Sequence, residues 1–214
     1  MVWEDERSLY GERKDIYGYD IAQTQEFSVC THARDQIEPA ISGDIVVWRD
    51  YRNGNWDIYA HDLSSGTEFP VTTHAANQQS VDVSGNIIVW EDNRNGNLDI
   101  FGYDVTTGRE FAICTAPDTQ GMPRISGDLV VWMDGRSGGG DIYAYDLSTG
   151  TEFPLCLHPA SQNIPDIGGK FVVWRDYRSL LDSGMDLYGA YIPEPASIAL
   201  LALGGLALIR RRRT

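Results

Sequence analysis

The sequence is poor in the features that usually mark an enzyme or a nucleic-acid-binding protein. It has no His-Glu-x-x-His motif, no phosphate-binding glycine loop and only three cysteines, none of them in a catalytic context. Acidic residues outnumber basic ones by 31 to 17, which gives a formal net charge of −14. Such a chain does not provide a surface that follows phosphates, so we expect no nucleic-acid partner and predict no catalytic residues.

A repeat runs through most of the chain. Tryptophan recurs every 42 residues, at Trp48, Trp90, Trp132 and Trp174, and an earlier copy stands at Trp3. A fixed period of this length, with several short strands in each unit, is typical of a β-propeller. We therefore predict an all-β fold with about five four-stranded blades, occupying residues 1–192.

Each full repeat is expected to form four strands. In the second repeat these are a short first strand ending at Ser42, an apolar second strand over residues 45–48, a third strand from Asp57 and a fourth strand around Phe69. Glycine turns and Asn-Gly pairs separate them, as hairpins require. The count gives five second and third strands but four first and fourth strands. We therefore expect the propeller to be incomplete at its N-terminus, with an upstream segment, preceded by an export signal, supplying the two missing strands.

The cysteines, histidines and glutamines follow the repeat. Cys30, Cys114 and Cys156 are separated by 84 and 42 residues, so they occupy one site in three blades and lie too far apart to pair. We expect them to be buried strand residues. The histidines and glutamines that recur in the links before each first strand are expected to cap loops. No metal site is predicted, because Arg52 stands where a calcium loop needs an acidic ligand.

Trp-x-Asp-x-Arg is the most conspicuous polar pattern. One interpretation is a ring of guanidinium groups that bind carboxylates or sulfated glycans. The other is an ion pair inside each blade, to the aspartate of the motif or to the one that opens the third strand. Recurrence in every blade favours a structural role for Trp48, Asp50, Arg52, Trp90, Asp92, Arg94, Trp132, Asp134, Arg136, Trp174 and Asp176.

Departures from the repeat indicate where a specific site would lie. The loop between the second and third strands is three residues longer in the first and last copies. If the ring closes, these two loops are neighbours on one face. Because binding residues usually lie on loops held by a rigid scaffold, we expect Tyr10, Arg13, Tyr177 and Arg178 to contribute to a ligand-binding groove.

The last 22 residues are of a different kind. Pro193, Glu194 and Pro195 precede fourteen uncharged residues, 196–209, which are followed by Arg210, Arg211, Arg212 and Arg213. Fourteen helical residues span about 21 Å, short of the roughly 30 Å of a bilayer core. The arginine cluster nevertheless favours membrane insertion with the arginines in the cytoplasm. We expect residues 193–214 to be a separate segment with a short hydrophobic helix.

This tripartite tail resembles the PEP-CTERM sorting signal of Gram-negative bacteria. The resemblance implies recognition of Pro193, Glu194 and Pro195 by an exosortase, with Arg210 to Arg213 as the cytoplasmic stop. It also implies removal of the tail and delivery from the inner membrane to the cell surface or extracellular matrix. That family carries an N-terminal signal peptide, which is not visible in this sequence.

The repeats resemble TolB-type, WD-like propellers, and especially the propeller repeats of archaeal surface proteins. The resemblance rests on Ile-Ser-Gly-Asp-x-Val-Val-Trp-x-Asp-x-Arg and Asp-Ile-Tyr-x-Tyr-Asp-Leu, and it implies a fold more than an activity. We expect a non-catalytic surface protein without a cofactor, which binds extracellular polysaccharide or a surface protein. The alternatives are a glycan-active hydrolase or lyase that uses the propeller channel, and an inert spacer.

Overall fold

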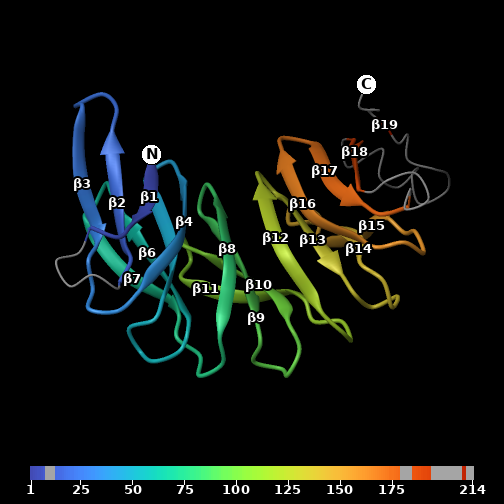
Figure 1. Ribbon diagram of the computed structural model, residues 1–214, viewed down its shortest axis with the longest axis horizontal. Helices are drawn as coiled ribbons and strands as arrows, with labels where there is room; N and C mark the ends of the chain where they lie inside the picture. Colours follow the sequence, from blue (N-terminus) through green and yellow to red (C-terminus); the bar gives the residue numbers. More distant parts are fainter. Residues whose placement is uncertain (8–12, 179–184, 194–208, 211–214) are drawn as a thin grey trace. The chain divides into compact units, whose positions relative to one another are not determined.

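The computed structural model describes residues 1–7, 13–178, 185–193 and 209–210. Its secondary structure in these residues consists of strands (Figure 1). The chain forms two compact units, Met1–Ala112 and Ile113–Thr214. Each unit is built from antiparallel sheets whose strands follow one another in the sequence.

The first unit contains three sheets. The first has three strands and the other two have four, and the last strand of the third sheet continues across the boundary between the units. The strands of the first sheet are β1 (Val2–Asp5), β2 (Asp15–Asp20) and β3 (Gln25–Cys30). Those of the second are β4 (Gln36–Ser42), β5 (Ile45–Asp50), β6 (Asp57–Asp62) and β7 (Thr67–Thr72). Those of the third are β8 (Gln78–Ser84), β9 (Ile87–Asp92), β10 (Asp99–Asp104) and β11 (Arg109–Cys114).

The second unit contains two further four-stranded sheets. The first of them is formed by β12 (Gln120–Ser126), β13 (Leu129–Asp134), β14 (Asp141–Asp146) and β15 (Thr151–Cys156). The other is formed by β16 (Gln162–Gly168), β17 (Phe171–Asp176), β18 (Asp186–Tyr191) and the two-residue β19 (Ile209–Arg210). The sheets recur with the period of the sequence repeat, so the predicted fold class is confirmed.

The turns within the sheets need the residues that the repeat supplies. Gly43, between β4 and β5, has a φ of 57°, and Gly54, between β5 and β6, has a φ of 92°. Both values lie in the left-handed region, which a side chain disfavours and glycine adopts freely. The same turns recur in the other sheets, which is why glycine keeps its place in the repeat.

The first strands are longer than the sequence analysis expected. β4 begins at Gln36 rather than at Pro39, and its pairing with β5 shifts register between Ile37 and Ala40. Glu38, at the shift, has a φ of 54°. A β-bulge at this point lets the strand continue through a proline that cannot donate a ladder hydrogen bond. Equivalent bulges interrupt β8, β12 and β16.

The core of each unit lies between consecutive sheets. Trp90 is fully buried and packs with Val47 and Ile58 of the preceding sheet. Trp174 does the same against Val131 and Ile142 in the second unit. The apolar second strands are therefore covered on both faces, which explains why they do not alternate with polar residues.

The C-terminal tail lies largely outside the described residues, so the predicted hydrophobic helix over residues 196–209 falls outside them as well, apart from its last residue. That residue, Ile209, belongs to β19 and pairs with Gly189, while Arg210 pairs with Tyr188. Among the described residues, no helix has the length and apolar character needed to cross a membrane.

Candidate functional site

The Trp-x-Asp-x-Arg residues form a compact hydrogen-bonded group, here called the clasp. In the second sheet, Trp48 Nε1 donates to Asp50 Oδ2 at 2.9 Å, and Arg52 Nη2 donates to the same oxygen at 2.6 Å. The backbone N–H of Arg52 donates to Asp50 Oδ1 at 2.9 Å. The Arg52 guanidinium also lies 3.9 Å above the ring of Tyr59. The carboxylate is thus held by three donors, and the arginine is paired with the aspartate of its own motif.

The clasp recurs in every sheet with the same bonds. Its aspartates are fully buried at positions 50, 92, 134 and 176. Burial alone raises a carboxyl pKa, but the hydrogen bonds from Arg136 and Trp132 outweigh it and lower the pKa of Asp134. The pKa values of Asp92 and Asp176 are lowered for the same reasons. The pKa of Arg136 is raised by its hydrogen bond to Asp134. These ion pairs are therefore fully ionised at neutral pH.

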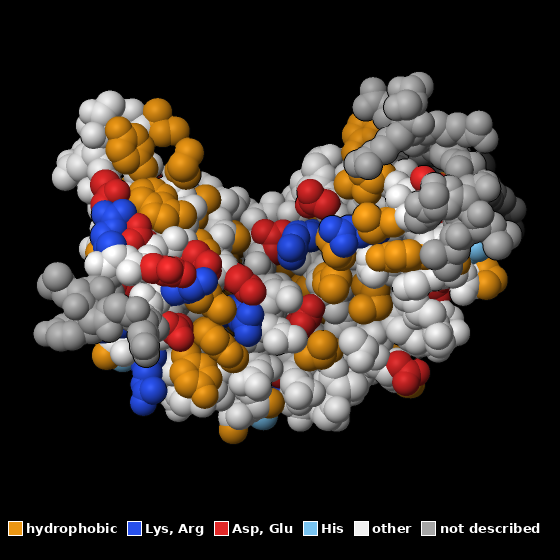
Figure 2. Space-filling view, viewed as in Figure 1, with side chains coloured by type: hydrophobic (Ala, Val, Ile, Leu, Met, Phe, Trp, Pro, Cys, Tyr) orange, Lys and Arg blue, Asp and Glu red, His pale blue; other side chains and the backbone are white. Residues whose placement is uncertain are grey.

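A glutamate on the fourth strand completes four of the five clasps. Arg52 Nη1 donates to Glu68 at 2.6 Å and Arg136 Nη1 to Glu152 at 2.7 Å, while Arg7 pairs with Glu26 and Arg94 with Glu110. On the face seen in Figure 2, basic side chains accordingly lie beside acidic ones. The sequence analysis placed a fourth strand around Phe69 but did not assign the glutamate that precedes this phenylalanine to the arginine. Its constant distance from the arginine in the full repeats was the available signal.

Arg178 is the exception. It donates to Asp176 through Nε and Nη2, at 2.8 and 2.6 Å, and to Cys156 Sγ at 3.0 Å. Within the described part of the chain no glutamate pairs with it, and its side chain is 18% exposed. Arg178 therefore holds its clasp together while the Nη1 edge, which the other four arginines use for glutamate, is not engaged by an acidic residue of the described chain.

The cysteines accept hydrogen bonds from clasps of the following sheet. Arg52 Nη2 lies 3.3 Å from Cys30 Sγ, and Arg136 Nη2 lies 3.1 Å from Cys114 Sγ. At the corresponding place Arg94 contacts Thr72 Oγ1. Burial raises the pKa of both Cys30 and Cys114 to about 12. All three cysteines are free and buried, as predicted.

The four residues expected to line a groove are only partly described. Tyr10 lies outside the described residues. Arg13 is in the first unit, with Nε 3.9 Å from Asp15 Oδ1. Tyr177 and Arg178 are consecutive in the second unit, and the backbone N–H of Tyr177 donates to the Ser161 carbonyl at 3.0 Å. Tyr177 and Arg178 are neighbours through the sequence alone, and the shared groove stays a prediction.

Residues 135–139 read Gly-Arg-Ser-Gly-Gly and match the Gly-x-Ser-x-Gly pattern of serine hydrolases. In those enzymes the serine stands on a turn between a strand and a helix, whereas here it lies in the loop between β13 and β14. Ser137 Oγ donates directly to Asp141, and His158 Nδ1 accepts from the Ala160 backbone. No imidazole bridges the serine and the aspartate, so this group is not a catalytic triad.

The buried glutamines and the histidines fasten the links between sheets. Gln36 and Gln78 are fully buried, and their Nε2 groups donate to the carbonyls of Arg34 and Ala76. His74 Nδ1 accepts from the Ala76 backbone at 3.2 Å. These are the loop-capping roles that the sequence analysis expected. Among the described residues, no group of three His, Cys, Asp or Glu side chains could hold a metal ion.

Comparison with solved structures identifies the fold. The chain is similar to TolB from Acinetobacter baumannii, with 18% identity and a TM-score of 0.66, over 98% of this chain and 52% of that one. It is similar to a putative TolB from Agrobacterium tumefaciens, with 16% identity and a TM-score of 0.65, over 97% and 80% of the two chains. An oligogalacturonate lyase in complex with manganese is also similar, with 15% identity and a TM-score of 0.61, over 85% and 55%.

These identities establish the fold alone, which is that of TolB-like β-propeller proteins. The chain spans about half the length of the Acinetobacter TolB chain. No curated protein matches the sequence. Residues 192–213 match the PEP-CTERM protein-sorting motif. The motif implies export and exosortase-mediated sorting to the cell surface of a Gram-negative bacterium, so the resemblance noted in the tail is confirmed.

Proposed function

We propose that this protein is a non-catalytic surface propeller that binds or organises extracellular material, a glycan or a surface protein. Residues 1–192 form the binding domain and residues 193–214 the sorting signal. The exosortase recognises Pro193, Glu194 and Pro195 while residues 196–209 are inserted in the inner membrane and Arg210 to Arg213 remain in the cytoplasm. The tail is then removed and the propeller reaches the cell surface or the matrix.

The observation that best supports this proposal is the incomplete clasp at Arg178. Four clasp arginines pair with a fourth-strand glutamate, whereas Arg178, which is as exposed as Arg94, has no glutamate partner among the described residues. A guanidinium edge that no acidic side chain of the described chain engages suits a carboxylate or sulfate group of a ligand. Because Asp176 already fixes the guanidinium, a ligand would find it oriented in advance. This supports a binding site for acidic extracellular material.

The direct experiment is a binding assay on polysaccharide fractions from the producing cells, with the Tyr177→Ala variant and a matched control. Tyr51 stands at the same place in the second clasp, where its ring packs on Trp56 with centroids 5.0 Å apart. We expect Tyr177→Ala to weaken binding by about tenfold, the effect of one lost aromatic contact, and Tyr51→Ala to leave it unchanged. Equal binding by both variants and by the combined Tyr10→Ala, Tyr177→Ala variant would contradict the proposal.

A glycan-active hydrolase or lyase is the alternative, since an oligogalacturonate lyase shares the fold. Catalytic carboxyl groups often have a raised pKa at a position used once. Among the described carboxyl groups, burial raises the pKa of Asp15 and Asp57, which occupy the same position at the start of a third strand. Asp57 accepts hydrogen bonds from Asn53 and Asn55, and this pattern supports a structural role.

Activity assays on the same fractions discriminate between the two functions. The binding proposal expects intact polysaccharide after prolonged incubation, as judged by size-exclusion chromatography and by release of reducing ends. It also expects no labelling of Ser137 by a fluorophosphonate, because its hydroxyl is held by Asp141. Depolymerisation by the wild-type protein would establish the enzyme instead.

A further inference from the structure

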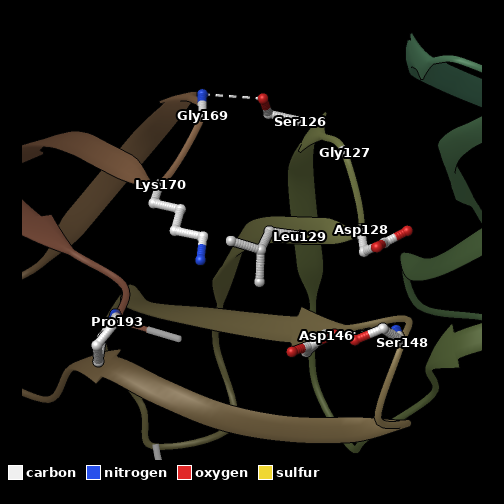
Figure 3. A pocket seen from close by; sticks show the side chains of 9 residues that line it. All are labelled: Ser126, Gly127, Asp128, Leu129, Asp146, Ser148, Gly169, Lys170 and Pro193. Carbon is white, nitrogen blue, oxygen red and sulfur yellow. Dashed lines mark hydrogen bonds between the residues drawn. The ribbon is translucent and has the colours of Figure 1, made fainter. Parts of the chain in front are cut away.

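A cavity of about 440 Å³ opens within the second unit, between its two sheets. This volume falls within the range of about 300 to 1,000 Å³ that is usual for small-molecule sites. Its walls come from the β12–β13, β14–β15 and β16–β17 turns and from Pro193, near the start of the sorting motif (Figure 3). The lining side chains used below are Ser126, Asp128, Leu129, Asp146, Ser148, Lys170 and Pro193.

The cavity is distinct from the clasps. Leu129 begins β13 at the cavity, whereas Asp134 ends the same strand at the clasp. The cavity and the clasps therefore lie at opposite ends of the strands. A ligand here would contact neither Tyr177 nor Arg178.

The last sheet departs from the repeat at this place. Lys170 stands where the preceding repeats have Asp44, Asn86 and Asp128. Pro193 stands where they have Ser64, Thr106 and Ser148.

In the third sheet, the side chains at these two positions are bonded to each other: Asn86 Nδ2 donates to Thr106 Oγ1 at 3.0 Å. Pro193 has no hydroxyl group, so it cannot take the part of Thr106. Figure 3 shows the Lys170 side chain extending into the cavity beside Leu129. In the last repeat, Lys170 thus places an amine where the other repeats have a carboxylate or an amide, and Pro193 removes the hydroxyl group opposite it.

The chemistry of the lining restricts the ligand. Lys170 and the Ser126 hydroxyl are donors, and the carboxylates of Asp128 and Asp146 are acceptors. The Ser148 hydroxyl donates to Asp146 Oδ1 at 2.6 Å and offers a ligand its lone pairs as an acceptor. The formal charge of the lining is −1, from two aspartates and one lysine. An anionic ligand is opposed by this charge and by the chain's −14. A cation is attracted by the same charges, but it offers no acceptor to the Lys170 amine or to the Ser126 hydroxyl. A neutral molecule with many hydroxyl groups matches both donors and acceptors.

An apolar surface lies among these polar groups. Leu129 is buried, and Pro193 carries no side-chain donor or acceptor. The C–H face of a pyranose ring packs on such a surface while its hydroxyls meet the carboxylates, the amine and the serines. We propose that this cavity binds a neutral sugar unit. The inference rests on the proposed binding of extracellular glycans and adds a second site, next to the start of the sorting motif.

The experiment is a titration of the full chain, in a detergent without a sugar head group, with methyl glucoside, methyl galactoside and methyl mannoside. Glucuronic acid and glucosamine provide the anionic and cationic comparisons. Binding is followed by saturation-transfer NMR. The test variant is Asp128→Ala with Lys170→Ala. The matched control is Asp44→Ala with Asn86→Ala. These two residues lie 84 residues earlier and occupy the same repeat position as Asp128 and Lys170.

We expect at least one neutral glycoside to bind, and we expect the test variant to lose about tenfold or more in affinity, as the loss of hydrogen bonds to charged groups implies. The control should bind like the wild type, and both variants should keep its circular dichroism spectrum. A preference for glucuronic acid or glucosamine would overturn the ligand class. Equal binding by both variants would show that the glycoside does not bind in this cavity, and it would leave the proposed function intact.

Failure of the two proposals can be separated. If no neutral glycoside binds but the polysaccharide fractions still do, the cavity inference is wrong and the proposed function stands. If neither binds, both are wrong.

Discussion

At the scale of single residues, the clasp shows why one motif tolerates so little variation. Asp134 receives hydrogen bonds from Trp132, from the Arg136 backbone and from the Arg136 side chain. Each donor would be left without its acceptor if the carboxylate were removed. Removing this carboxylate is costly because the buried Trp132 indole and two side-chain N–H groups of Arg136 lose their acceptor, while Glu152 still pairs with Arg136 Nη1. The motif therefore recurs because each sheet must satisfy the hydrogen bonds of its own carboxylate.

The first prediction concerns this carboxylate. Asp134→Ala should lower the free energy of unfolding by about 2 kcal/mol, since it leaves the buried Trp132 indole without its acceptor and removes one of the two ion pairs of Arg136. The control is Asp44→Ala, because Asp44 is exposed. Denaturant titrations of the two variants measure the difference. A cost at Asp134 no larger than that at Asp44 would show that the clasp is not structural.

The second prediction concerns pH. The folded-state pKa values of Asp92, Asp134 and Asp176 lie below the ordinary value of 3.8. A lowered carboxyl pKa adds stability that is fully present above the ordinary pKa and is lost as the pH falls through the folded value. The melting temperature should therefore fall steeply below about pH 4. Asp134→Asn should flatten that fall, and an unchanged slope in this variant would contradict the assignment.

The third prediction concerns the cysteines. With the pKa of Cys30 and Cys114 raised to about 12, these thiols are protonated at pH 8 and covered by neighbouring sheets. Ellman's reagent should not label them in the folded protein, and all three should react after guanidinium unfolding. Cys114→Thr should retain the folded stability, because Thr72 already takes this place beside Arg94. Rapid labelling of the native protein would mean that the links between sheets open readily.

At the scale of elements, the strands follow from the repeat, and most could be read from the sequence. The apolar run ending at Trp48, the glycine at 43 and the Asn-Gly pair at 53–54 each specify a strand or a turn. The bulge at Glu38 was missed because its positive φ falls on a residue that carries no glycine signal. It is instead imposed by the register between β4 and β5.

The candidate site was less accessible to sequence reasoning than the fold. Tyr177 and Arg178 could be chosen because their loop is longer than its equivalents. The incomplete clasp at Arg178 could not, since it depends on which glutamate lies beside each arginine across the sheet. The cavity at Lys170 had a sequence signal, an amine at an Asp/Asn position. That this residue lines a cavity depends on how the two sheets of the second unit pack, which the sequence does not show.

The fourth prediction concerns a close contact between β13–β14 and the next sheet. The N–H of Gln162 donates to the Gly140 carbonyl at 2.5 Å. A Cβ on Gly140 would press into the Gln162 carbonyl oxygen, whereas one on Gly139 would meet only ordinary van der Waals contact. Gly140→Ala should cost about 1 to 3 kcal/mol of stability through overpacking, and Gly139→Ala much less. Thermal unfolding of both variants checks this, and equal melting points would contradict the close approach.

At the scale of the whole molecule, the folded repeats and the sorting motif meet at one residue. Ile192 is buried, and its N–H donates to the Lys170 carbonyl at 2.8 Å, while Pro193 lines the cavity. The motif matched in the tail begins at residue 192. The chain therefore runs from β18 through the buried Ile192 directly into the matched motif. Residue 192 thus belongs both to the folded part of the chain and to the matched sorting motif.

This arrangement leads to the last prediction. Replacing Pro193, Glu194 and Pro195 by alanine should abolish processing, so that the protein accumulates at its full length in the membrane fraction. Replacing Ile192 by Ser should act differently. It removes a buried apolar anchor and exposes the motif more often, so processing should be retained or accelerated while the melting temperature falls. Immunoblots of membrane and surface fractions, with a lysine substitution at exposed Ile21 as the control, measure both effects. Loss of processing in Ile192→Ser despite a folded propeller would show that the exosortase needs the docked end of the last sheet rather than a free motif.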